Sequence, residues 1–547
     1  MYASQRPIDN YIFEDIYKVD KVQQKKTAIS FKGVNYSFFE LEQSVNYFAK
    51  KLIDIGIKPN DHVALLSLNS FNWVVAFYAI IKIGAVAVLL NYMNRYDNLV
   101  EAVKRADCKF LVYGSFFAAT KDSSAFNNLI NECNIPLENT ISINPHDLVF
   151  KDVLVSTKNI EYIPNYYSRE EESKRTSYII YTTGTTSKPK AAMLSQYSLT
   201  NIIYHNFYKL DPFFPQKFMC LLPAFHCFGL LVINAYLAFY RTVYLNDLSN
   251  PASIYKEFLR NKCGDYASVS YIYDRLARTP LWWTHRGNFI RHCILGGGFT
   301  SQQEYAFLEK KYGRGKFLNG YGQTECSPMI SFVYPDAPKN KRYSTVGTPM
   351  EDIEIAIMDV HTKKIIPSSQ KGEILIKGYN VFNGYYKVDK ASQPFDDEGY
   401  LHTGDIGYLD DDGYLVLNGR IKDIIVRRGE NISPKEIEEA MLAFKEFERV
   451  RVLGFPSIED GEYILACVEL KKKPLHFVEQ KYLDELHKTL PSIKIPSHII
   501  YMKKFPLTAN GKLDEAKLRE ICIQKLSIFV NKKLARETAR LIKNMGK

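Results

Sequence analysis

Residues 28–113 alternate between short apolar runs and longer amphipathic segments, a pattern that predicts strands and helices in turn. Ser37 and Glu40 have the spacing of a capping box, so we expect a helix from there to about Ile55, ended by Gly56. Further strands are expected at 62–66, 85–90 and 110–113, and further helices at 71–82 and from about 97. Repeated β-α units of this kind predict parallel sheets covered by helices.

The apolar run at 71–90 is long enough to be considered as a membrane span, because about 20 apolar residues cross a bilayer. Lys82 lies inside this run and Gly84 follows it. We therefore interpret the run as a buried helix, a turn and a buried strand. Residues 120–175 are polar and weakly patterned, and we expect an insertion and connector there.

Beyond residue 433 the pattern predicts a small α+β unit. Ser433 is expected to cap a helix that begins near Pro434, with Glu436 three residues on. The other expected elements are a continuation of this helix over 435–447, strands at 450–454 and 464–470, and a helix at 481–490.

The stretch 402–438 resembles a joint between two domains, since an apolar strand ends before Asn418 and a second apolar run begins at Ile424. Asp405 is flanked by glycines, which predicts a loop where its carboxylate could hold a diol. Together with Arg420 it suggests a ribose-binding pair at the domain boundary. The alternative is a surface β-meander with a salt-bridged turn.

The bulk composition is that of an ordinary globular protein, with 46% hydrophobic and 24% charged residues in a chain of 547. This length favours about two to four domains. The net charge of +11 favours anionic partners such as nucleotides, phosphorylated cofactors or acidic membrane. Because the basic residues are spread along the chain and no zinc-finger, RRM-like or basic-zipper pattern accompanies them, no nucleic acid is expected as a partner.

Nine cysteines, without a CxxC pair, indicate a reducing compartment rather than a disulfide framework or a zinc site. The first residues contain no apolar signal core. We therefore expect a cytoplasmic location.

A predicted strand at 177–181 runs directly into a loop at 182–190 with the sequence TTGTTSKPK. Hydroxyls, a glycine and two lysines in so short a stretch suit a polyphosphate, because hydroxyls and backbone amides donate while lysine neutralises charge. The loop lacks the Walker A spacing, and Pro189 prevents the helix start that a Walker loop needs. The alternative is a surface loop without a ligand.

His226 lies between aromatic residues after a proline, in an expected buried corner. One interpretation is a packed core histidine. The other is a residue of a substrate pocket, since the neighbouring Phe225, Phe228 and Gly229 could shape a cavity for an apolar ligand.

Three consecutive glycines, 296–298, follow a predicted strand, and their missing side chains would let a base or an acyl chain lie on the backbone. Tyr321 stands between two glycines and offers a ring for stacking, while Thr324 and Glu325 offer a hydroxyl and a carboxylate for a metal-bound phosphate. Lys512 follows an Asn-Gly turn; it is either solvated or brought to an active site by domain closure.

These motifs, in one order over residues 181–512, resemble the adenylate-forming superfamily of acyl-CoA synthetases, adenylation domains and luciferases: YTTGTTSKPK, GGG, NGYGQTE, TGD, GRIKD and PLTANGK. The stretches VGTPM at 346–350 and GEILIKG at 372–378 also fit, so the resemblance covers nearly the whole chain. It implies an α/β fold. A large N-terminal domain, 1–419, would hold parallel-type sheets layered with helices and a β-subdomain, and a small mobile α+β domain, 420–547, would follow, with the active site between them.

The resemblance also implies roles for single residues. Thr185 and Glu325 would bind Mg²⁺, and with His226 and Lys512 they are the expected catalytic residues; Lys512 would contact the carboxylate and the α-phosphate. The expected ATP phosphate ligands are Thr182, Thr183, Gly184, Thr185, Thr186, Ser187, Lys188 and Lys190. The remaining cofactor-binding residues are Gly297, Gly298 and Tyr321 around adenine, Gly322 and Thr324 beside them, Asp405 and Arg420 at the ribose, Lys422 as the hinge, and Gly429 at the pantetheine channel.

The implied chemistry explains these parts. A carboxylate attacks the α-phosphate of ATP to give an acyl-adenylate, and a thiol then attacks that adenylate while AMP leaves. No protein nucleophile is needed, because the site only has to align the reactants and neutralise charge. One site serving two reactions needs Lys512 withdrawn between them, which explains a hinge at Lys422. Ser187 and Ala191 stand where the family usually has glycine.

The substrate segment AFHCFG lacks the aspartate with which amino-acid adenylation domains hold an ammonium group, so the resemblance implies an acid without an amino group. We expect a medium- or long-chain fatty acid or an aryl acid, with coenzyme A as the acceptor. The alternatives are transfer to the phosphopantetheine of an acyl carrier protein, a luciferase-like oxygenase, and a nucleotide-binding protein without turnover.

The basic tail at 523–547 keeps an approximate helical spacing of apolar residues. Peripheral contact with an anionic membrane is one interpretation, and a solvated or loosely docked helix is the other. The sequence carries no indication of oligomeric state.

Overall fold

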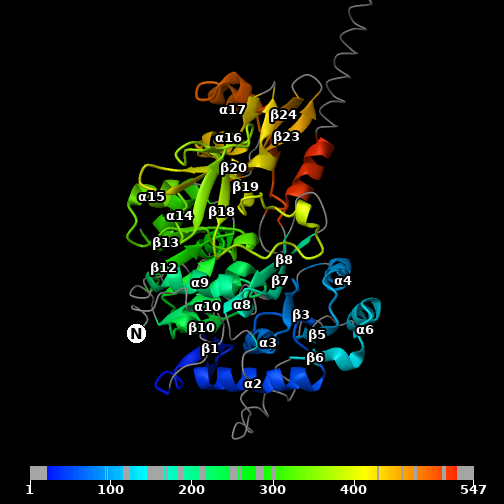
Figure 1. Cartoon of the computed structure of the whole chain (residues 1–547). Coiled ribbons are helices and arrows are strands. Elements are labelled where there is room, and N and C mark those ends of the chain that lie inside the picture. The colour runs from blue at the N-terminus through cyan, green and yellow to red at the C-terminus, as the bar shows by residue number, and fades with distance from the viewer. Residues whose placement is uncertain are drawn as a thin grey trace, which may run out of the picture. The chain divides into compact units, whose positions relative to one another are not determined.

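The computed structural model describes the following residues: 16, 21–92, 94, 96–114, 123–143, 166, 170–182, 189–209, 216–246, 257, 260–278, 289–297, 300, 302–313, 315–427, 430–457, 461–472, 477–507 and 513–525. The chain divides into two compact units (Figure 1). The large unit comprises Met1–Thr403 and Tyr408–Val416, and the small unit comprises Gly404–Gly407 and Leu417–Lys547.

The first sheet of the large unit has six strands in the order β6-β5-β3-β4-β7-β8. All neighbours in it are parallel except β7 and β8, which form an antiparallel pair. The strands are β3 (His62–Leu66), β4 (Val86–Leu89), β5 (Phe110–Tyr113), β6 (Thr140–Ser142), β7 (Thr176–Thr182) and β8 (Lys190–Ser195). The strands predicted at 62–66, 85–90, 110–113 and 177–181 are therefore confirmed.

The apolar run at 71–90 forms the helix α3 (Phe71–Lys82) and the strand β4, as predicted. Every residue of α3 is buried, Lys82 included. Within the part of the chain that the structure describes, none of the helices combines the length and the apolar character needed to span a bilayer.

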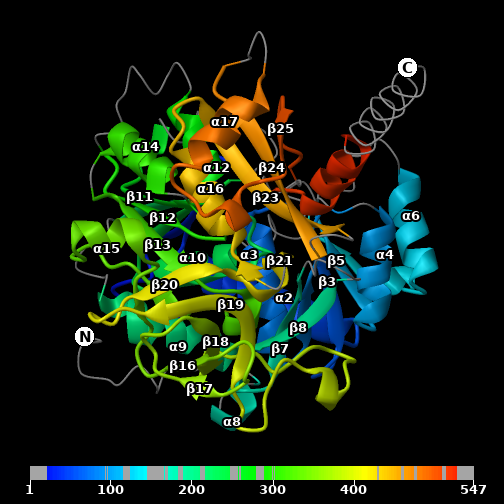
Figure 2. The same ribbon diagram turned by 90° about the horizontal axis from the view of Figure 1, so that it is seen from above.

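The stretch 120–175, which we expected to be an insertion and connector, contains regular elements. Residues in this stretch form α6 (Ser123–Glu132), α8 (Glu170–Ser173) and the edge strand β6, which pairs in parallel with β5. A three-residue strand at a sheet edge needs no long apolar run, which is why the pattern did not show it. Both views place α6 beside α4 (Tyr96–Arg105) (Figures 1 and 2).

The second sheet of the large unit has nine strands in the order β15-β14-β13-β12-β11-β9-β10-β1-β2. Its strands from β13 to β1 are parallel, and β2, β14 and β15 run antiparallel to their neighbours. The strands are β1 (Thr27–Phe31), β2 (Val34–Ser37), β9 (Lys217–Cys220), β10 (Thr242–Leu245), β11 (Asp265–Ser268), β12 (His292–Leu295), β13 (Phe317–Tyr321), β14 (Ser331–Phe332) and β15 (Thr348–Pro349).

Helices accompany this parallel sheet, as the β-α alternation predicts. They are α2 (Phe38–Asp54), α9 (Gln196–Asn206), α10 (Cys227–Ala238), α12 (Ser270–Ala277) and α14 (Gln302–Tyr312). The capping box of α2 is confirmed, because the Ser37 side chain accepts from the amide of Glu40 and the Glu40 carboxylate accepts from the amide of Ser37. The helix ends at Asp54, and Gly56 follows with a φ of 93°.

A third sheet is the expected β-subdomain, with the order β17-β16-β18-β19-β20. Its strands are β16 (Glu354–Met358), β17 (Ile365–Ile366), β18 (Gly372–Lys377), β19 (Leu401–Leu409) and β20 (Leu415–Arg420). The division between the two units passes through β19 and β20.

The small unit is an α+β sandwich of one sheet with helices on both faces. Its strands run in the order β22-β21-β24-β23, with β25 paired to β24. The elements are β21 (Ile425–Arg427), β22 (Glu430–Ile432), α16 (Pro434–Leu442), β23 (Phe447–Ser457), β24 (Gly461–Leu470), α17 (Glu479–Leu486) and β25 (His498–Met502). Residues 515–525 are also helical.

Two apolar cores lie on the two faces of this sheet. One joins Ile437 and Met441 of α16 to Leu486 of α17, and the other joins Leu453 of β23 to Leu518 of the helix 515–525. The mixed α/β fold with a large N-terminal and a smaller C-terminal part, which the resemblance implies, is confirmed.

Candidate active site

The expected phosphate loop is the connection of a β-hairpin. Thr182 of β7 pairs with Lys190 of β8, and the Thr182 hydroxyl donates to the Lys190 carbonyl at 3.4 Å. Thr182 and Lys190 therefore stand at the two ends of the loop. The other predicted phosphate ligands, Thr183, Gly184, Thr185, Thr186, Ser187 and Lys188, lie outside the described residues.

Helix α4 holds both ends of this loop. The Tyr181 hydroxyl donates to the Ala102 carbonyl at 2.6 Å, and Nη1 of Arg105 donates to the Pro189 carbonyl at 2.8 Å. Burial raises the pKa of Tyr181, so its hydroxyl stays a donor. The two ends of the loop are thus held by residues of a helix far away in the sequence, which the loop motif alone did not reveal.

The outer edge of β8 is paired by the segment 383–386. The Met193 amide donates to the Gly384 carbonyl at 3.0 Å, and the Tyr386 amide donates to the Ala191 carbonyl at 2.9 Å. This pairing brings Tyr385, which forms a bridge with Ala192, next to the strand that leaves the phosphate loop.

Tyr385 joins two of the predicted site residues. Its hydroxyl donates to Oε1 of Glu325 at 2.6 Å, and Nζ of Lys190 lies 4.8 Å from the centroid of its ring. Burial, reinforced by the Glu325 carboxylate, raises the pKa of Tyr385, so the phenol remains protonated. Sequence reasoning missed Tyr385, because no motif marks a tyrosine whose partner is 60 residues away.

Glu325 meets the requirement for a Mg²⁺ ligand. It is 9% exposed and belongs to a short 3₁₀ turn, η5 (Thr324–Cys326), and its own carbonyl accepts from the Phe382 amide at 3.0 Å. Mg²⁺ in nucleotide sites takes one or two carboxylates together with phosphate oxygens, so one oriented, buried carboxylate fits the protein's share of such a site. The second predicted metal ligand, Thr185, is outside the described residues.

Tyr321 ends β13 and is buried, with 8% exposure. The glycine after it has a structural cause: a Cβ on Gly322 would lie 1.7 Å from the carbonyl oxygen of Pro328. Likewise a Cβ on Gly320 would lie 3.0 Å from Sδ of Met329. Close packing of this neighbouring segment therefore accounts for both glycines, whatever the ring of Tyr321 contacts.

The ring that lies against Gly296, the first glycine of GGG, is that of Phe228. A Cβ on Gly296 would lie 2.9 Å from Cε1 of Phe228, so the phenyl ring fills the space that we expected a base or an acyl chain to occupy. The prediction is therefore corrected for Gly296. Gly297 has a φ of 77°, which favours glycine, and Gly298 lies outside the described residues.

His226 stands at the N-cap of α10 and is half-buried rather than fully buried. Its amide donates to the Pro223 carbonyl at 3.2 Å, and its ring lies 4.6 Å from that of Phe225. Gly229 is needed for this turn, because a Cβ there would lie 2.1 Å from the Pro223 carbonyl oxygen. Beside His226, Sγ of Cys227 lies 3.4 Å from Oγ1 of Thr324.

Asn69 fixes the segment before His226. Its amide group donates to the Leu222 carbonyl at 2.8 Å and accepts from the Ala224 amide at 2.8 Å. These contacts span 153 and 155 residues, and nothing in the sequence near Asn69 signals them.

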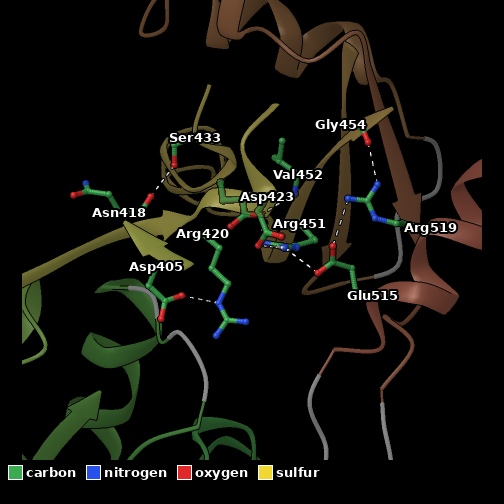
Figure 3. Close-up of polar contacts among 11 residues, drawn as sticks. Asp405, Asn418, Arg420, Asp423, Ser433, Arg451, Val452, Gly454, Glu515 and Arg519 are labelled. Atoms are coloured by element: carbon green, nitrogen blue, oxygen red, sulfur yellow. Dashed lines mark hydrogen bonds and ion pairs between the residues drawn. The ribbon is translucent and has the colours of Figure 1, made fainter. Parts of the chain in front are cut away.

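Asp405 and Arg420 form the predicted pair, within the small unit (Figure 3). Nε of Arg420 donates to Oδ1 of Asp405 at 2.8 Å; Asp405 is 4% exposed, and the Arg420 side chain is 50% exposed. The prediction that Asp405 lies on a loop is wrong. It lies inside β19, because Gly404 adopts a φ of 70° and lets the strand continue past the glycine.

The expected hinge residue Lys422 is in a 3₁₀ turn, η7 (Ile421–Asp423). Burial and, secondarily, Arg420 lower its pKa, while Asp423 and Glu515 oppose that shift. Ser433 is the N-cap residue of α16, which begins at Pro434 as expected, but its side chain does not make the predicted capping hydrogen bond. Its hydroxyl instead donates to the Asn418 carbonyl at 2.8 Å and so ties the helix start to β20 (Figure 3).

Two predicted residues of the small unit, Gly429 and Lys512, lie outside the described residues. The chain on both sides of Lys512 is nevertheless paired. Leu507 and Leu513 form an antiparallel bridge, and the Asp514 amide donates to the Pro506 carbonyl at 2.9 Å.

The chain matches known protein families over most of its length. Residues 17–386 match the family described as AMP-binding enzyme, and residues 436–512 match the AMP-binding enzyme C-terminal domain. Among curated proteins, the chain is 26% identical to the putative acyl-CoA synthetase YngI of Bacillus subtilis, over 91% of this chain and 94% of that protein. It is 26% identical to the mitochondrial medium-chain acyl-CoA ligase ACSF2 of Danio rerio, over 89% of this chain and 84% of that protein.

Solved structures show the same fold. ATP-bound MatB from Rhodopseudomonas palustris superposes with a TM-score of 0.82 at 24% identity, covering 94% of this chain and 99% of that one. The o-succinylbenzoate CoA synthetase MenE of Bacillus subtilis, in complex with an acyl-adenylate intermediate, gives 0.75 at 23% identity, covering 93% and 98%.

Proposed function

This chain belongs to the AMP-binding enzyme family, and from that premise we propose that it joins a carboxylic acid to coenzyme A at the expense of ATP, releasing AMP and pyrophosphate. The family match and the acyl-CoA ligase relatives support an AMP-forming acid–thiol ligase as its class. The observation that carries the proposal is the Lys190–Tyr385–Glu325 group at the end of the phosphate loop.

The proposed reaction has two steps. A carboxylate oxygen attacks the α-phosphorus of ATP, the bond to the β-phosphate oxygen breaks, and pyrophosphate leaves. The thiolate of coenzyme A then attacks the acyl carbonyl, and the bond to AMP breaks. Neither step needs a protein nucleophile, so the protein's task is alignment and charge neutralisation.

The large unit supplies the groups that we propose for the phosphates. Thr182 and Lys190, with the loop from Thr183 to Lys188, would bind phosphate oxygens, and Thr185 and Glu325 would hold Mg²⁺. When bound, Mg²⁺ neutralises the charge that develops on the phosphate oxygens. Tyr385 would keep the Glu325 carboxylate in one orientation through its hydrogen bond.

We assign adenine to the ring of Tyr321 near Gly297 and Gly298. Gly322 is a further proposed cofactor-binding residue, and Thr324 would offer its hydroxyl to a metal-bound phosphate. The small unit would supply Asp405 with Arg420 for the ribose, Lys512 for the carboxylate and α-phosphate, Lys422 as the hinge, and Gly429 at the pantetheine channel. The proposed domains are 1–419, which includes Asp405 in sequence, and 420–547, and the domain 420–547 would move between the two steps. The exposed guanidinium of Arg420 and the buried carboxylate of Asp405 support a hydrogen-bonding role toward a diol.

The acid that we propose is a medium- or long-chain fatty acid or an aryl acid. The segment around His226 supports an apolar ligand, because Phe225 and Phe228 flank the histidine and the ring of Tyr92 lies 5.3 Å from that of Phe225. The medium-chain acyl-CoA ligases among the relatives agree with this choice. Phe228 over Gly296 would limit the depth of the acyl pocket.

Coenzyme A is the acceptor we favour, since relatives covering most of the chain are named acyl-CoA synthetase or ligase. A carrier-protein phosphopantetheine is the alternative acceptor, because it presents the same terminal thiol. We place the enzyme in the cytoplasm on the strength of its cysteine content, and we leave the basic tail as a proposed peripheral membrane contact.

Acid-dependent exchange of labelled pyrophosphate into ATP tests the first step. We expect exchange with decanoate or benzoate and none with free amino acids, and an acyl-CoA mass with AMP when coenzyme A is added. Release of ADP, or no exchange with any acid in a panel of fatty and aryl acids, would refute the proposal. Thioester formation on a carrier protein but not on coenzyme A would select the alternative acceptor.

A further inference from the structure

Arg451 of β23 is surrounded by three carboxylates, within the small unit (Figure 3). Its Nη1 lies 3.2 Å from Oε1 of Glu438, and its Nη2 lies 3.2 Å from Oδ2 of Asp423 and 3.0 Å from Oε2 of Glu515. The Arg451 side chain is 20% exposed. One half-buried guanidinium therefore joins three segments that are separate in the sequence.

Each carboxylate belongs to a different element. Asp423 follows Lys422 in the 3₁₀ turn η7, and Glu438 lies in α16. Glu515 opens the helix 515–525, whose start is capped by Asp514, since the Lys517 amide donates to Oδ1 of Asp514 at 3.0 Å.

Glu515 has a second cationic partner. Nη2 of Arg519 lies 3.5 Å from Oε1 of Glu515, while Nη1 of Arg519 donates to the Gly454 carbonyl at 3.0 Å. The first turn of the helix 515–525 is thus fastened to β23 at two points, Arg451 and Gly454 (Figure 3).

The charges explain why the group stays together. Burial raises the pKa of Glu438, and Arg451 opposes that shift while the Val452 amide donates to the same carboxylate oxygen at 2.8 Å. Burial lowers the pKa of Arg451, but Glu438, Glu515 and Asp423 outweigh it and raise the pKa above the ordinary value. Without the Arg451 guanidinium, the positive charge between the three carboxylates would be missing. We expect their mutual repulsion to move them apart.

Such a separation would displace residues that are close in the sequence to Lys422 and to Lys512. Asp423 adjoins Lys422, and Glu515 stands three residues after Lys512 in the sequence. Leu513 and Asp514 are the residues between Lys512 and Glu515, and they pair with Leu507 and Pro506. A shift of Glu515 at the helix start would therefore disturb this pairing next to Lys512.

We propose that Arg451 is a positioning residue for acyl-adenylate formation: it holds the turn that contains Lys422 and the helix 515–525 against the same strand, so that these two segments keep one fixed arrangement. The proposal rests on the proposed function, because Lys422 and Lys512 receive their roles from it. Coupling through a shared, half-buried ion-pair network is the physical basis.

The experiment separates the two steps of the reaction in purified full-length variants. R451M, R451K, D423N and E515Q are measured for pyrophosphate exchange with the acid that the wild type uses best, and for thioester formation from supplied acyl-adenylate and coenzyme A. The matched control is K494M, which removes an ion pair of the same unit, Lys494 with Glu436 at 2.6 Å, that does not involve the Arg451 group. Thermal unfolding of each variant is recorded in parallel.

We expect R451M and E515Q to lower kcat for exchange about ten-fold or more, with the KM for ATP and the thioester step within about three-fold of the wild type. R451K keeps the charge but not the two-pronged contact, and should recover part of the loss. K494M should match the wild type. If R451M does not fold, E515Q carries the test, because it leaves Arg451 paired with Glu438 and Asp423.

Equal slowing of both steps in E515Q would identify a purely structural role and overturn the proposal. Unchanged exchange in folded R451M and E515Q, beside an active wild type, would overturn it as well and leave the proposed function intact. A wild type without exchange toward any acid would overturn the proposed function, and this inference with it.

Discussion

The hydroxyl of Tyr385 donates a hydrogen bond of 2.6 Å to Oε1 of Glu325, and both side chains are buried. The ring that carries this hydroxyl also faces Nζ of Lys190 at 4.8 Å. Tyr385 therefore contacts both the carboxylate that we propose for Mg²⁺ and the lysine that we propose for phosphate. Its own position is set by backbone pairing with β8, so the relationship does not depend on a ligand.

Tyr385→Phe removes the hydrogen bond and keeps the ring over Lys190. Because a hydrogen bond to a charged group contributes about 1.5–3 kcal/mol, we expect kcat for adenylation to fall about ten-fold. The Mg²⁺ concentration for half-maximal rate should rise, since the Glu325 carboxylate is no longer held in one orientation. Exchange of pyrophosphate at varied Mg²⁺ measures both effects.

Tyr386→Phe is the matched control for this variant. Tyr386 belongs to the same segment, and its hydroxyl donates to Asp107 at 2.8 Å, whereas Glu325 accepts from Tyr385. We expect a wild-type Mg²⁺ dependence from it. A shared response of both variants would show that the segment 383–386 is merely loosened, and the orienting role of Tyr385 would be abandoned.

Arg105→Met should weaken ATP binding. Nη1 of Arg105 holds the Pro189 carbonyl at one end of the phosphate loop, so its loss leaves more loop freedom to be ordered when ATP binds. We expect the KM for ATP to rise about five-fold with kcat nearly unchanged, because the anchor touches neither metal nor acid. Lys104→Met, which changes an exposed neighbour on the same helix, should leave the KM for ATP unchanged. Equal KM values for ATP in the two variants would show that the contact of Arg105 with Pro189 does not contribute to ATP binding.

The burial of Asp265 predicts that the free energy of unfolding depends on pH, independently of catalysis. It is 0% exposed; burial raises its pKa, although its hydrogen bonds with His292 and Tyr236 oppose that rise. A raised pKa in the folded state favours the protonated form. Its stabilising contribution is therefore present below the ordinary value of 3.8 and is lost as pH rises through the folded-state pKa.

Asp265→Asn removes this titration while keeping the shape of the side chain. The difference in unfolding free energy between the wild type and D265N should shrink or reverse as pH rises above about 4, by about 1.4 kcal/mol for each unit of the pKa rise. Urea unfolding at closely spaced pH values measures it. Asp411→Asn, at an exposed position of the same unit, should show no such trend, and a pH-independent difference for D265N would contradict the assignment.

Local signals explain what the sequence predicted well. The capping box of α2 needs two residues three apart, and the helix α3 and strand β4 need one apolar run interrupted by Gly84, so neighbouring residues carry all the information. The Asp405–Arg420 pair was predicted as a pair for a similar reason, since only a strand and a turn separate the two residues.

The contacts that the sequence did not reveal are distant ones. Tyr385 reaches Glu325, Arg105 reaches Pro189, and Asn69 reaches Leu222, and each contact exists only because separate segments are packed together. For Ser433 the residue was placed correctly at the helix start but its hydrogen-bond partner was not, and for Asp405 the expected loop is a strand. The serine hydroxyl bonds to Asn418 instead of its own helix, and the strand β19 continues through Gly404.

The contact between Phe228 and Gly296 predicts a coupled effect on stability and acid selectivity. A Cβ on Gly296 would meet the Phe228 ring at 2.9 Å, so Gly296→Ala should destabilise the large unit by about 1–3 kcal/mol. Phe228→Ala removes the obstructing ring; we expect G296A to cost less in the double variant, and F228A alone to shift the best acid toward longer chains. Thermal unfolding of the four proteins and kcat/KM across a series of fatty acids provide the two measurements. Additive stability effects would mean that the two side chains do not meet, and an unchanged chain-length profile in F228A would remove Phe228 from the acyl pocket.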